Sequence, residues 1–430
     1  MGYHHRWGII LRTLTLRRGI TYSIGKTVFK KDEPVPFSDE RMLNRLIYTK
    51  LFEENPPLCY YFIRRKQGLP ITKNRLARIG NDWIRIPEKG FVRLTRYQWS
   101  NLEESGQYEV VPPIEVMDRY VSEGKPNFSL LIIRDMGAGD VIIATDVIYN
   151  IRLRYPEAKI VFATSDRYTS LVNNLAFISE VHSIDECNPS DYDVSVNLCG
   201  WSEQYPLCAK VHRSDMFGRA FSDDFPWIEH KISLELYPEE NDWFLEFNKV
   251  HNPTDKKIVC IQPYGSSGHR SLRPIHVNSV IDWFASNGYF VYVYGQSQWP
   301  NVFPNREGSS VTLWDEISLR QVISLIANSS LLICPDSSGY HIAAAFGTPS
   351  IPIFTTIHEG VRVTYYPKCY PLRASELSCS PCWDRPCGLS EAMNCCGLMS
   401  GERIIKKCEE VIDSGFKDCE HPVYSSPDWN

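Results

Sequence analysis

The sequence predicts an α/β protein with two doubly wound, mostly parallel sheets in tandem, preceded by a small basic α+β unit. Its 430 residues are enough for two or three domains of roughly 100–200 residues each. Short apolar strands alternate with helical segments from about residue 128 onward, which is the pattern of a parallel sheet. With 43% hydrophobic and 23% charged residues, the chain has the composition of a globular protein that buries large cores.

The first region, residues 1–125, is irregular and contains a predicted β-rich unit at about 72–112. There, DWIRI and GFVRLT alternate like strands, and YQWSNLEESG is typical of a short helix that leads into the strand YEVVP. The polar stretch SEGKPN at 122–127 then indicates a linker.

This first region is also strongly basic. Residues 1–100 carry 20 Lys and Arg against 8 Asp and Glu, whereas the remaining residues carry 26 basic and 43 acidic side chains, although the net charge of the chain is only −5. The asymmetry favours an anionic partner for residues 1–100, either nucleic acid or a phosphate-bearing membrane surface. The alternative is that this basic surface is simply solvated or packs against the acidic rest of the chain.

The second region, residues 126–250, begins with the predicted strand FSLLIIRD. A turn at Gly137-Ala138-Gly139-Asp140 follows, then the amphipathic helix VIIATDVIYNIRLRYP, which Pro156 ends, and then the strand AKIVFAT.

The third region, residues 251–430, repeats this alternation. Its predicted elements are the strand KKIVCIQPYG, the helix VNSVIDWFASNG, the strand YFVYVYG, the strand SLLICPD and the helix YHIAAAFG. The division between the two α/β domains is predicted near 240–254. Ligands of open α/β sheets bind beyond the carboxyl ends of the strands, so we expect a cleft between these domains.

Asp140 follows the first strand at the mouth of that cleft. A carboxylate in this place can take a proton from an acceptor hydroxyl as a general base. Asp is also a favoured residue at the start of a helix, so a purely structural role is the alternative.

Two later loops suit an anionic ligand. Small hydroxyl residues and arginines follow one strand at Ser266, Ser267, Arg270 and Arg273. A second loop lies between a strand and a helix, where free backbone amides favour anions; it comprises Asp336, Ser337, Ser338, Gly339, Tyr340 and His341. Because both loops follow strands of one domain, they favour a nucleotide diphosphate over two separate helix caps.

Eight of the 14 cysteines lie between Cys369 and Cys419. In a chain without a secretory signal, Cys-x-x-Cys followed by further cysteines predicts a tetrahedral structural zinc site. The expected ligands are Cys379, Cys382, Cys387 and Cys395, with Cys396 as an alternative to Cys395. Disulfides, redox chemistry or unligated thiols are the other interpretations.

These motifs combine into a family resemblance over about residues 128–410. Five segments follow one another with the order and spacing of glycosyltransferase family 9. They are RDMGAGDVIIATDVIYNIRLRYPEAKIVFAT, DYDVSVNL, KVHRSDMF, IQPYGSSGHRSLRP and ISLRQVISLIANSSLLICPDSSGYHIAAAFGTPSIPIF. The chain therefore resembles the ADP-heptose:lipopolysaccharide heptosyltransferases and their relatives. The resemblance implies a GT-B fold of two facing Rossmann-like domains, a nucleotide-diphosphate sugar donor, an inverting mechanism and no catalytic metal.

The resemblance also implies roles for single residues. Asp140 matches the family's proposed base, and Arg134 matches a basic residue just before the glycine-rich turn. The residues that match the donor-binding positions are Gly139, Ser266, Ser267, Asp336, Ser337, Ser338, Gly339 and His341. Two departures exist: the glycine of DSSGYH falls one position late, and HRSLRP replaces a Lys-x-Trp-Pro segment, so either Arg270 or Arg273 takes the place of the lysine.

The acceptor has two interpretations. Residues 75–113 resemble a small module of Mu-like bacteriophage proteins, which slightly favours a modified DNA base flipped toward Asp140. The rival is a lipopolysaccharide core heptosyltransferase whose basic extension lies on the anionic inner membrane. A non-catalytic sugar-nucleotide or DNA-binding protein is a third hypothesis.

The sequence has no run of roughly 18 apolar residues and no leader cleavage site, so we expect a cytoplasmic protein of a bacterium or a phage-infected host.

Overall fold

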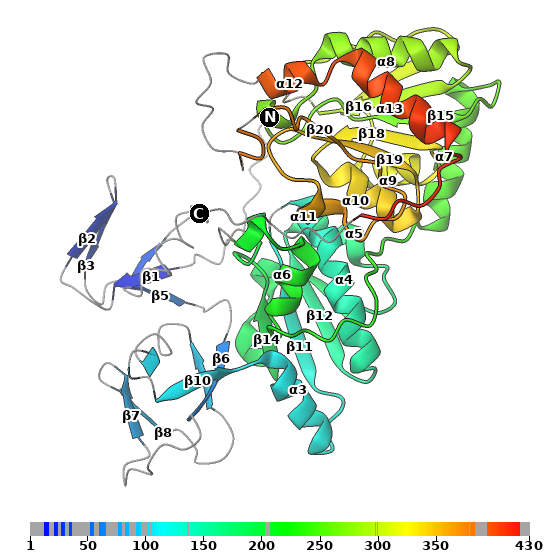
Figure 1. The fold of residues 1–430 in the computed structure, drawn as a ribbon. Helices are drawn as coiled ribbons and strands as arrows, with labels where there is room; N and C mark the ends of the chain where they lie inside the picture. Colours follow the sequence, from blue (N-terminus) through cyan, green and yellow to red (C-terminus); the bar gives the residue numbers. More distant parts are fainter. Residues whose placement is uncertain are drawn as a thin grey trace, which may run out of the picture.

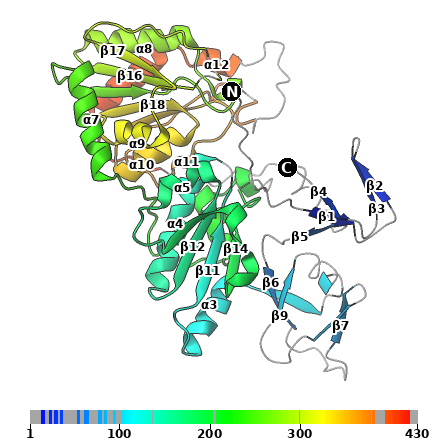
Figure 2. The same ribbon diagram turned by 180° about the vertical axis from the view of Figure 1, so that it is seen from behind.

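The structure is a computed structural model of the 430-residue chain. It describes residues 107–421 except 136, 203–206, 297, 299, 378 and 383–393; before residue 107 it describes the strands named below and residues 102, 103 and 105. Two α/β domains lie one above the other, with the N-terminal region beside the lower one (Figure 1, Figure 2).

Short antiparallel strands form the described part of the N-terminal region. These strands are β1 (Thr13–Leu16), β2 (Thr21–Ile24), β3 (Thr27–Lys30), β4 (Pro34–Pro36), β5 (Phe52–Asn55), β6 (Tyr60–Arg65), β7 (Leu76–Ile79), β8 (Asp82–Arg85), β9 (Val92–Thr95) and β10 (Tyr108–Val111). β1 pairs with β4 and β5, β6 pairs with β9 and β10, and two hairpins join β2 to β3 and β7 to β8. The strands predicted from DWIRI, GFVRLT and YEVVP are confirmed, whereas most of YQWSNLEESG lies outside the described residues.

This region contacts the first α/β domain through Arg93. Its guanidinium donates hydrogen bonds to the backbone carbonyls of Tyr192 (2.9 Å), Ser190 (3.4 Å) and Pro189. The chain then passes from β10 into α3 (Pro113–Ser122), whose Val116 and Met117 are fully buried. The N-terminal strands are therefore attached to the first α/β domain by the hydrogen bonds of Arg93 and by the amphipathic helix α3.

The first α/β domain has a four-stranded parallel sheet in the order β13-β12-β11-β14. Its elements are β11 (Ser129–Ile133), α4 (Ala138–Arg154), β12 (Lys159–Thr164), α5 (Asp166–Val172), β13 (Glu180–Ser183), the 3-10 turns η1 (Ile184–Glu186) and η2 (Pro189–Asp191), β14 (Val194–Asn197), η3 (Leu207–Ala209) and α6 (Arg213–Arg219). The predicted strand and helix positions are confirmed, but α4 is not amphipathic as predicted. Residues 141–148 of α4 are all buried, because α4 packs against the sheet, α6 and a helix of the second domain.

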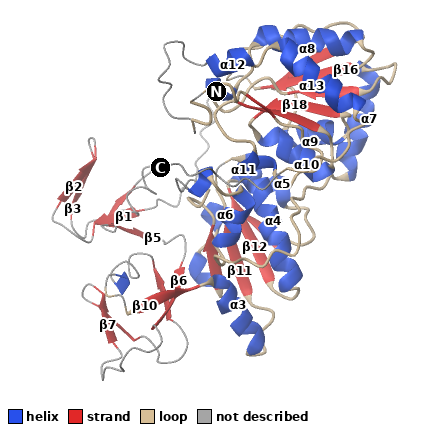
Figure 3. Cartoon of the chain, viewed as in Figure 1, coloured by secondary structure: helices blue, strands red, loops and turns tan. Residues whose placement is uncertain are grey.

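The second α/β domain has a parallel sheet in the order β17-β16-β15-β18-β19-β20 (Figure 3). Its elements are α7 (Pro238–His251), β15 (Ile258–Ile261), η4 (Gly268–Arg270), α8 (Pro274–Ser286), β16 (Phe290–Gly295), β17 (Ser310–Trp314), α9 (Leu319–Ala327), β18 (Leu331–Pro335), α10 (Ser338–Phe346), β19 (Ser350–Phe354), α11 (Gly360–Val363), β20 (Leu372–Arg373), α12 (Asn394–Leu398) and α13 (Gly401–Asp413). All residues of β15, β18 and β19 are buried, as expected for a parallel sheet that helices cover on both faces.

α7 crosses the predicted division between the domains and packs on the second one. Glu240, near its start, forms an ion pair with Arg320 of α9 at 2.5 Å. Apolar side chains from both sheets then join one continuous core. The two domains are therefore in direct contact, and their strand ends meet along a common cleft.

Candidate active site

A cavity of about 760 Å³ lies between the two domains. The first domain contributes the turn 137–140, Arg167, Tyr168 and Arg213, and the second contributes residues that follow β15, β16, β17 and β18. The cleft predicted beyond the strand ends is therefore present in the structure.

Asp140 lies in the first turn of α4, at the floor of this cavity. Its Oδ2 accepts a hydrogen bond from Arg134 Nη2 at 2.5 Å, and its Oδ1 is paired with the guanidinium of Arg213. Burial acts to raise the pKa of Asp140, but the two guanidinium groups hold that pKa well below its usual range. Asp140 is therefore an ionised carboxylate at neutral pH.

Arg134 holds the carboxylate of Asp140 in position. It directly follows β11 and is 2% exposed. Its guanidinium also donates to the carbonyl of Leu198 at 3.3 Å and lies over the ring of Phe217. It is not among the residues that line the cavity. Its contact with Asp140 makes it a positioning residue rather than a contact for the sugar donor.

Glycines allow the turn before α4 to approach the second domain closely. Gly137 has φ = +80°, which few side chains tolerate. A Cβ on Gly139 would lie 3.0 Å from Cδ2 of His341, so a larger residue would separate the two walls of the cleft at this point. The glycine-rich turn thus brings Asp140 next to the loop that follows β18.

The loop after β15 places only some of its predicted residues in the cleft. Ser266 and Arg270 line the cavity, and Nη1 of Arg270 lies 3.3 Å from Oδ2 of Asp336. Ser267 is not among the lining residues, and its hydroxyl is buried. Arg273 points away, because a Cβ on Gly397 of α12 would lie 3.2 Å from its Cζ. Of the two arginines considered for the diphosphate, Arg270 is the one at the cleft.

The loop after β18 lies opposite Asp140. Asp336 accepts a hydrogen bond from the Tyr340 hydroxyl at 2.9 Å, and Ser337 caps α10 while donating to Gln262 Oε1 at 2.8 Å. A Cβ on Gly339 would lie 2.8 Å from that same Gln262 oxygen, so a larger residue in place of the late glycine of DSSGYH would displace the Gln262 side chain. These contacts fix the first turn of α10 with its backbone amides at the cavity.

His341 lies on α10 directly beside the turn of the first domain. Its Nδ1 lies 2.8 Å from the Tyr366 hydroxyl, and burial lowers the pKa of His341 well below its usual value. The imidazole is therefore neutral at pH 7, and it contributes hydrogen bonding rather than positive charge to the cavity.

Four charged lining residues were not identified from the sequence: Arg167, Arg213, Asp315 and Arg362. Arg213 lies in KVHRSDMF at the start of a helix, where the helix dipole disfavours a positive charge. This unfavourable position is the signal in the sequence that could have revealed it. Arg362 is 5% exposed and lies in the one-turn helix α11, which has no periodic pattern. Tertiary structure alone brings it to the cleft.

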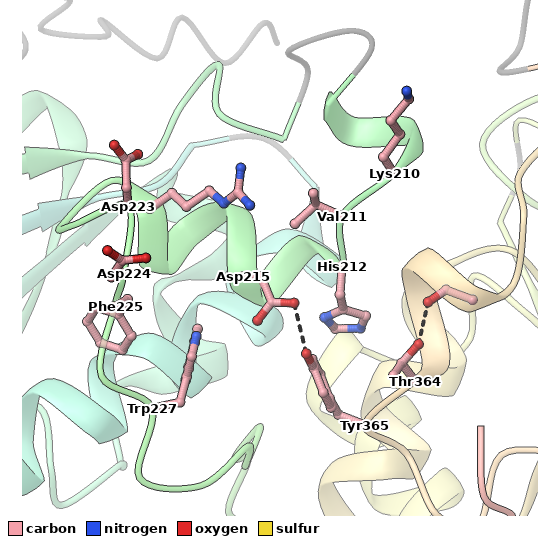
Figure 4. Close-up of a pocket in the computed structure, with 12 residues that line it drawn as sticks. Lys210, Val211, His212, Asp215, Asp223, Asp224, Phe225, Trp227, Thr364 and Tyr365 are labelled. Atoms are coloured by element: carbon pink, nitrogen blue, oxygen red, sulfur yellow. Dashed lines mark hydrogen bonds between the residues drawn. The ribbon is translucent and has the colours of Figure 1, made fainter. Parts of the chain in front are cut away.

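A second cavity of about 310 Å³ lies between α6 and the α11 segment (Figure 4). Figure 4 shows the Tyr365 hydroxyl donating to Asp215, a bond of 2.8 Å that joins the two domains. The Tyr365 ring also stacks on His230 at 3.5 Å and 5°, and His212 lies 3.1 Å from the carbonyl of Arg362. Both cavities therefore share the α6 and α11 segments as walls.

The predicted zinc site is not supported by the part of the tail that the structure describes. Within the described residues, no three His, Cys, Asp or Glu side chains come together as metal ligands. Cys379, Cys382, Cys395 and Cys396 belong to the described part of the chain, whereas Cys387 lies outside it. Cys396 lies 3.2 Å from the His269 carbonyl, and its hydrogen bond to Cys395 lowers the pKa of Cys395 to about 6.

No helix in the described part of the chain has the length and apolar character needed to span a lipid bilayer.

Comparisons with known proteins agree with the fold. Residues 223–393 match the model of glycosyltransferase family 9 (heptosyltransferase). No curated protein matches the sequence.

Several solved structures share the fold. A family 9 glycosyl transferase from Veillonella parvula aligns with a TM-score of 0.54 and 15% identity, over 67% of this chain and 97% of that one. The E. coli ADP-heptose lipopolysaccharide heptosyltransferase II aligns with a TM-score of 0.53 and 12% identity, over 67% and 99%. The dodecameric iron-containing heptosyltransferase TibC of enterotoxigenic E. coli aligns with a TM-score of 0.52 and 15% identity, over 71% and 79%.

The two facing Rossmann-like domains predicted from the sequence are thus confirmed as a GT-B-type fold. With the family match over residues 223–393, the comparisons support a glycosyltransferase of this fold.

Proposed function

We propose that this protein is an inverting, metal-independent glycosyltransferase that moves a sugar from a nucleotide-diphosphate sugar to a hydroxyl of a saccharide acceptor. One observation carries the proposal. The ionised carboxylate of Asp140 faces, across one cavity, a set of anion-binding groups on the second domain: Ser266, Arg270, the first turn of α10 and Arg362.

In this reaction Asp140 accepts the proton of the acceptor hydroxyl. The hydroxyl oxygen forms a bond to the anomeric carbon while the bond from that carbon to the diphosphate oxygen breaks, and the electron pair leaves with the diphosphate. An ionised carboxylate offers about four lone-pair sites, so Asp140 can accept this hydroxyl while it keeps both arginine partners. The arginines orient the carboxylate and keep it ionised.

The second domain stabilises the leaving diphosphate. Arg270 and the buried Arg362 supply positive charge, and the backbone amides that begin α10 supply oriented donors. Such preorganised groups act most strongly in a cleft shielded from water, where charge develops in the transition state. Because Arg273 points toward α12, we assign the diphosphate contact in HRSLRP to Arg270.

For the acceptor we propose a saccharide of the lipopolysaccharide type. One solved structure of this fold is by its title a lipopolysaccharide heptosyltransferase. The second cavity adds support, because its lining combines the aromatic residues Trp227 and Tyr365 with the carboxylates of Asp223 and Asp224. Amphipathic rings and hydroxyl-accepting carboxylates suit a sugar. No described residue favours the modified DNA base, and the resemblance of residues 75–113 to a phage module stays a prediction.

A thiolate metal site in the tail also stays a prediction. The TibC structure is described as iron-containing, and four cysteine thiolates bind either zinc or iron. Residues 383–393, which include Cys387, lie outside the described part of the chain, and no catalytic step involves the site.

The proposal is tested with Asp140→Asn, which keeps the shape of the side chain but removes its basicity. We expect sugar transfer to fall by about 10²–10⁴-fold, measured by mass spectrometry with a panel of nucleotide sugars. Truncated lipopolysaccharide and DNA that is either unmodified or hydroxymethylated serve as the acceptor sets. Nucleoside-diphosphate affinity should be retained, because Asp140 contacts the acceptor side.

Asp185→Asn, an exposed carboxylate of the same domain, serves as the matched control and should transfer sugar like the parent. An Asp140→Asn protein that keeps full activity would remove Asp140 from the mechanism. A sugar-sized mass gain on DNA nucleosides, with none on lipopolysaccharide, would overturn the proposed acceptor.

A further inference from the structure

The turn η4 carries Arg270 to the cleft, and few hydrogen bonds hold the turn from within. The N–H of Arg270 donates to the carbonyl of Ser267 at 3.1 Å, and the hydroxyl of Ser271 donates to the same carbonyl at 2.8 Å. A 3-10 turn has poorer hydrogen-bond geometry than an α-helix, and η4 consists of only three residues. The direction of the Arg270 side chain therefore depends on contacts that reach η4 from other parts of the chain.

The peptide group that precedes Arg270 is held at both of its ends. It consists of the carbonyl of His269 and the N–H of Arg270, which lie in one plane. The N–H is bound within the turn, whereas the carbonyl oxygen accepts a hydrogen bond from the hydroxyl of Thr355 at 2.5 Å. The thiol of Cys396 donates to the same oxygen at 3.2 Å. Since a carbonyl oxygen has two lone pairs, these two donors use its accepting capacity fully.

Thr355 connects this peptide group to the central sheet. It directly follows β19, whose residues are all buried, and is itself 3% exposed. Its own carbonyl accepts a hydrogen bond from the hydroxyl of Ser380 at 3.1 Å. The hydroxyl of Thr355 therefore extends from a backbone that is fixed by strand pairing on one side and by the cysteine-rich tail on the other.

Thr355 does not reach the cleft itself. Neither Thr355 nor His269 is among the residues that line the cavity, whereas Arg270 is. Nη1 of Arg270 lies 3.3 Å from Oδ2 of Asp336, at the loop where the first turn of α10 begins. A rotation of the preceding peptide group would turn the Cα–Cβ bond of Arg270 and carry the guanidinium away from this loop.

We propose that Thr355 is a positioning residue for the donor diphosphate: its hydroxyl fixes the peptide group before Arg270 and so holds that guanidinium at the cleft. This inference rests on the proposed function, since it requires a nucleoside diphosphate as the ligand of Arg270. Only the hydroxyl of Thr355 can donate to the carbonyl. Serine can therefore replace threonine here, whereas valine, which has nearly the same shape, cannot.

The test is a double-mutant cycle in which calorimetry measures the affinity for ADP, GDP, CDP and UDP. In Thr355→Val, affinity for the diphosphates that the parent binds should fall about three- to tenfold, the effect of one lost hydrogen bond. Thr355→Ser should keep the affinity of the parent. In an Arg270→Gln background, Thr355→Val should change the remaining affinity by less than about twofold, because the group that it positions is gone.

Thr348→Val is the matched control. Thr348 is 4% exposed in the same domain, and its hydroxyl donates to the carbonyl of Ile326 at 3.1 Å, a contact of α9 rather than of η4. Each valine variant removes one buried hydrogen bond, so both should lose stability in urea unfolding. Only Thr355→Val should lose diphosphate affinity.

The outcomes separate this inference from the proposed function. If the parent binds none of the four diphosphates, the proposed function fails and this inference fails with it. If the parent binds one of them and Thr355→Val binds it equally well, Thr355 has no positioning role. An equal loss in the parent and Arg270→Gln backgrounds also overturns the inference, since a general defect of the fold acts in both. Thr355→Ala, which removes the same hydroxyl, gives a second variant in case the valine protein does not fold.

Discussion

Asp140 has two cationic neighbours, and this affects its chemistry and the stability of the fold. Its depressed pKa means that the folded protein binds a proton here less readily than the unfolded chain does. The stabilisation by this carboxylate is therefore complete above the pKa of an unfolded aspartate. It is lost as the pH falls through the lower pKa of the folded state. Ionisation of Asp140 should consequently not limit activity at mildly acidic pH.

Arg362 is the residue for which the structure makes the sharpest prediction about the leaving group. Arg362→Gln removes a buried cation from the cleft, so we expect nucleoside-diphosphate affinity to fall about tenfold. Affinity for the nucleoside without phosphates should not change, and calorimetry measures both. Arg306→Gln, on the surface pair with Asp282, is the control. An unchanged diphosphate affinity in Arg362→Gln would show that this guanidinium serves the fold alone.

Single residues differ in how far the sequence could reveal them. Asp140 and Asp336 follow predicted strands, so the rule that ligands bind at strand ends was enough to select them. Arg213 and Arg362 reach the cleft through α6 and α11, short helices whose placement depends on contacts between the domains. Asp315 gave no signal, because a left-handed backbone at a strand end is a property of the folded chain.

At the scale of elements, α9 carries two residues that line the cavity, Leu319 and Val322, and packs its buried residues into the core. The Ser318 hydroxyl oxygen accepts a hydrogen bond from the backbone N–H of Gln321 at 3.2 Å, and Gln321 Oε1 accepts one from the backbone N–H of Ser318 at 2.8 Å. This reciprocal capping fixes the start of the helix that presents Leu319 and Val322 to the cleft.

Ser318→Ala should therefore destabilise the protein by about 1 kcal/mol and weaken nucleotide binding slightly, because the first turn of α9 frays. Urea unfolding measures the stability. Ser286→Ala, an exposed serine near the end of α8, should change it by less than about 0.5 kcal/mol. Equal effects of the two substitutions would contradict the assigned role of the cap.

The elements themselves were largely predictable. Apolar runs such as FSLLIIRD and SLLICPD became buried parallel strands, because a sheet covered on both faces selects continuous apolar sequence. The amphipathic character predicted for α4 was wrong. A helix enclosed by the sheet, α6 and α10 needs apolar or paired side chains all round, and Asp146 meets this need by pairing with His230 at 3.0 Å.

For the whole molecule, the contact between the domains depends on few polar bonds. The bond from Tyr365 to Asp215 joins α6 to the segment after α11, beside the stacked ring of His230. Tyr365→Phe keeps the stack and removes the bond. We expect a loss of about 0.5–1.5 kcal/mol in urea unfolding, together with a lower kcat at unchanged nucleoside-diphosphate affinity.

Tyr289→Phe, whose ring packs on Phe284 within the second domain, is the matched control and should leave kcat unchanged. A Tyr365→Phe protein with the kcat of the parent would show that this bond does not help to align the two walls of the cleft.

The close approach of Gly139 to His341 also brings together the beginnings of α4 and α10. The positive end of each helix dipole faces the same cavity, and Asp140 with its two arginines leaves an excess positive charge there. A diphosphate bound between the two helix starts would therefore be a counter-ion shared by both domains, and its charge would add to the contacts that hold the two walls of the cleft together.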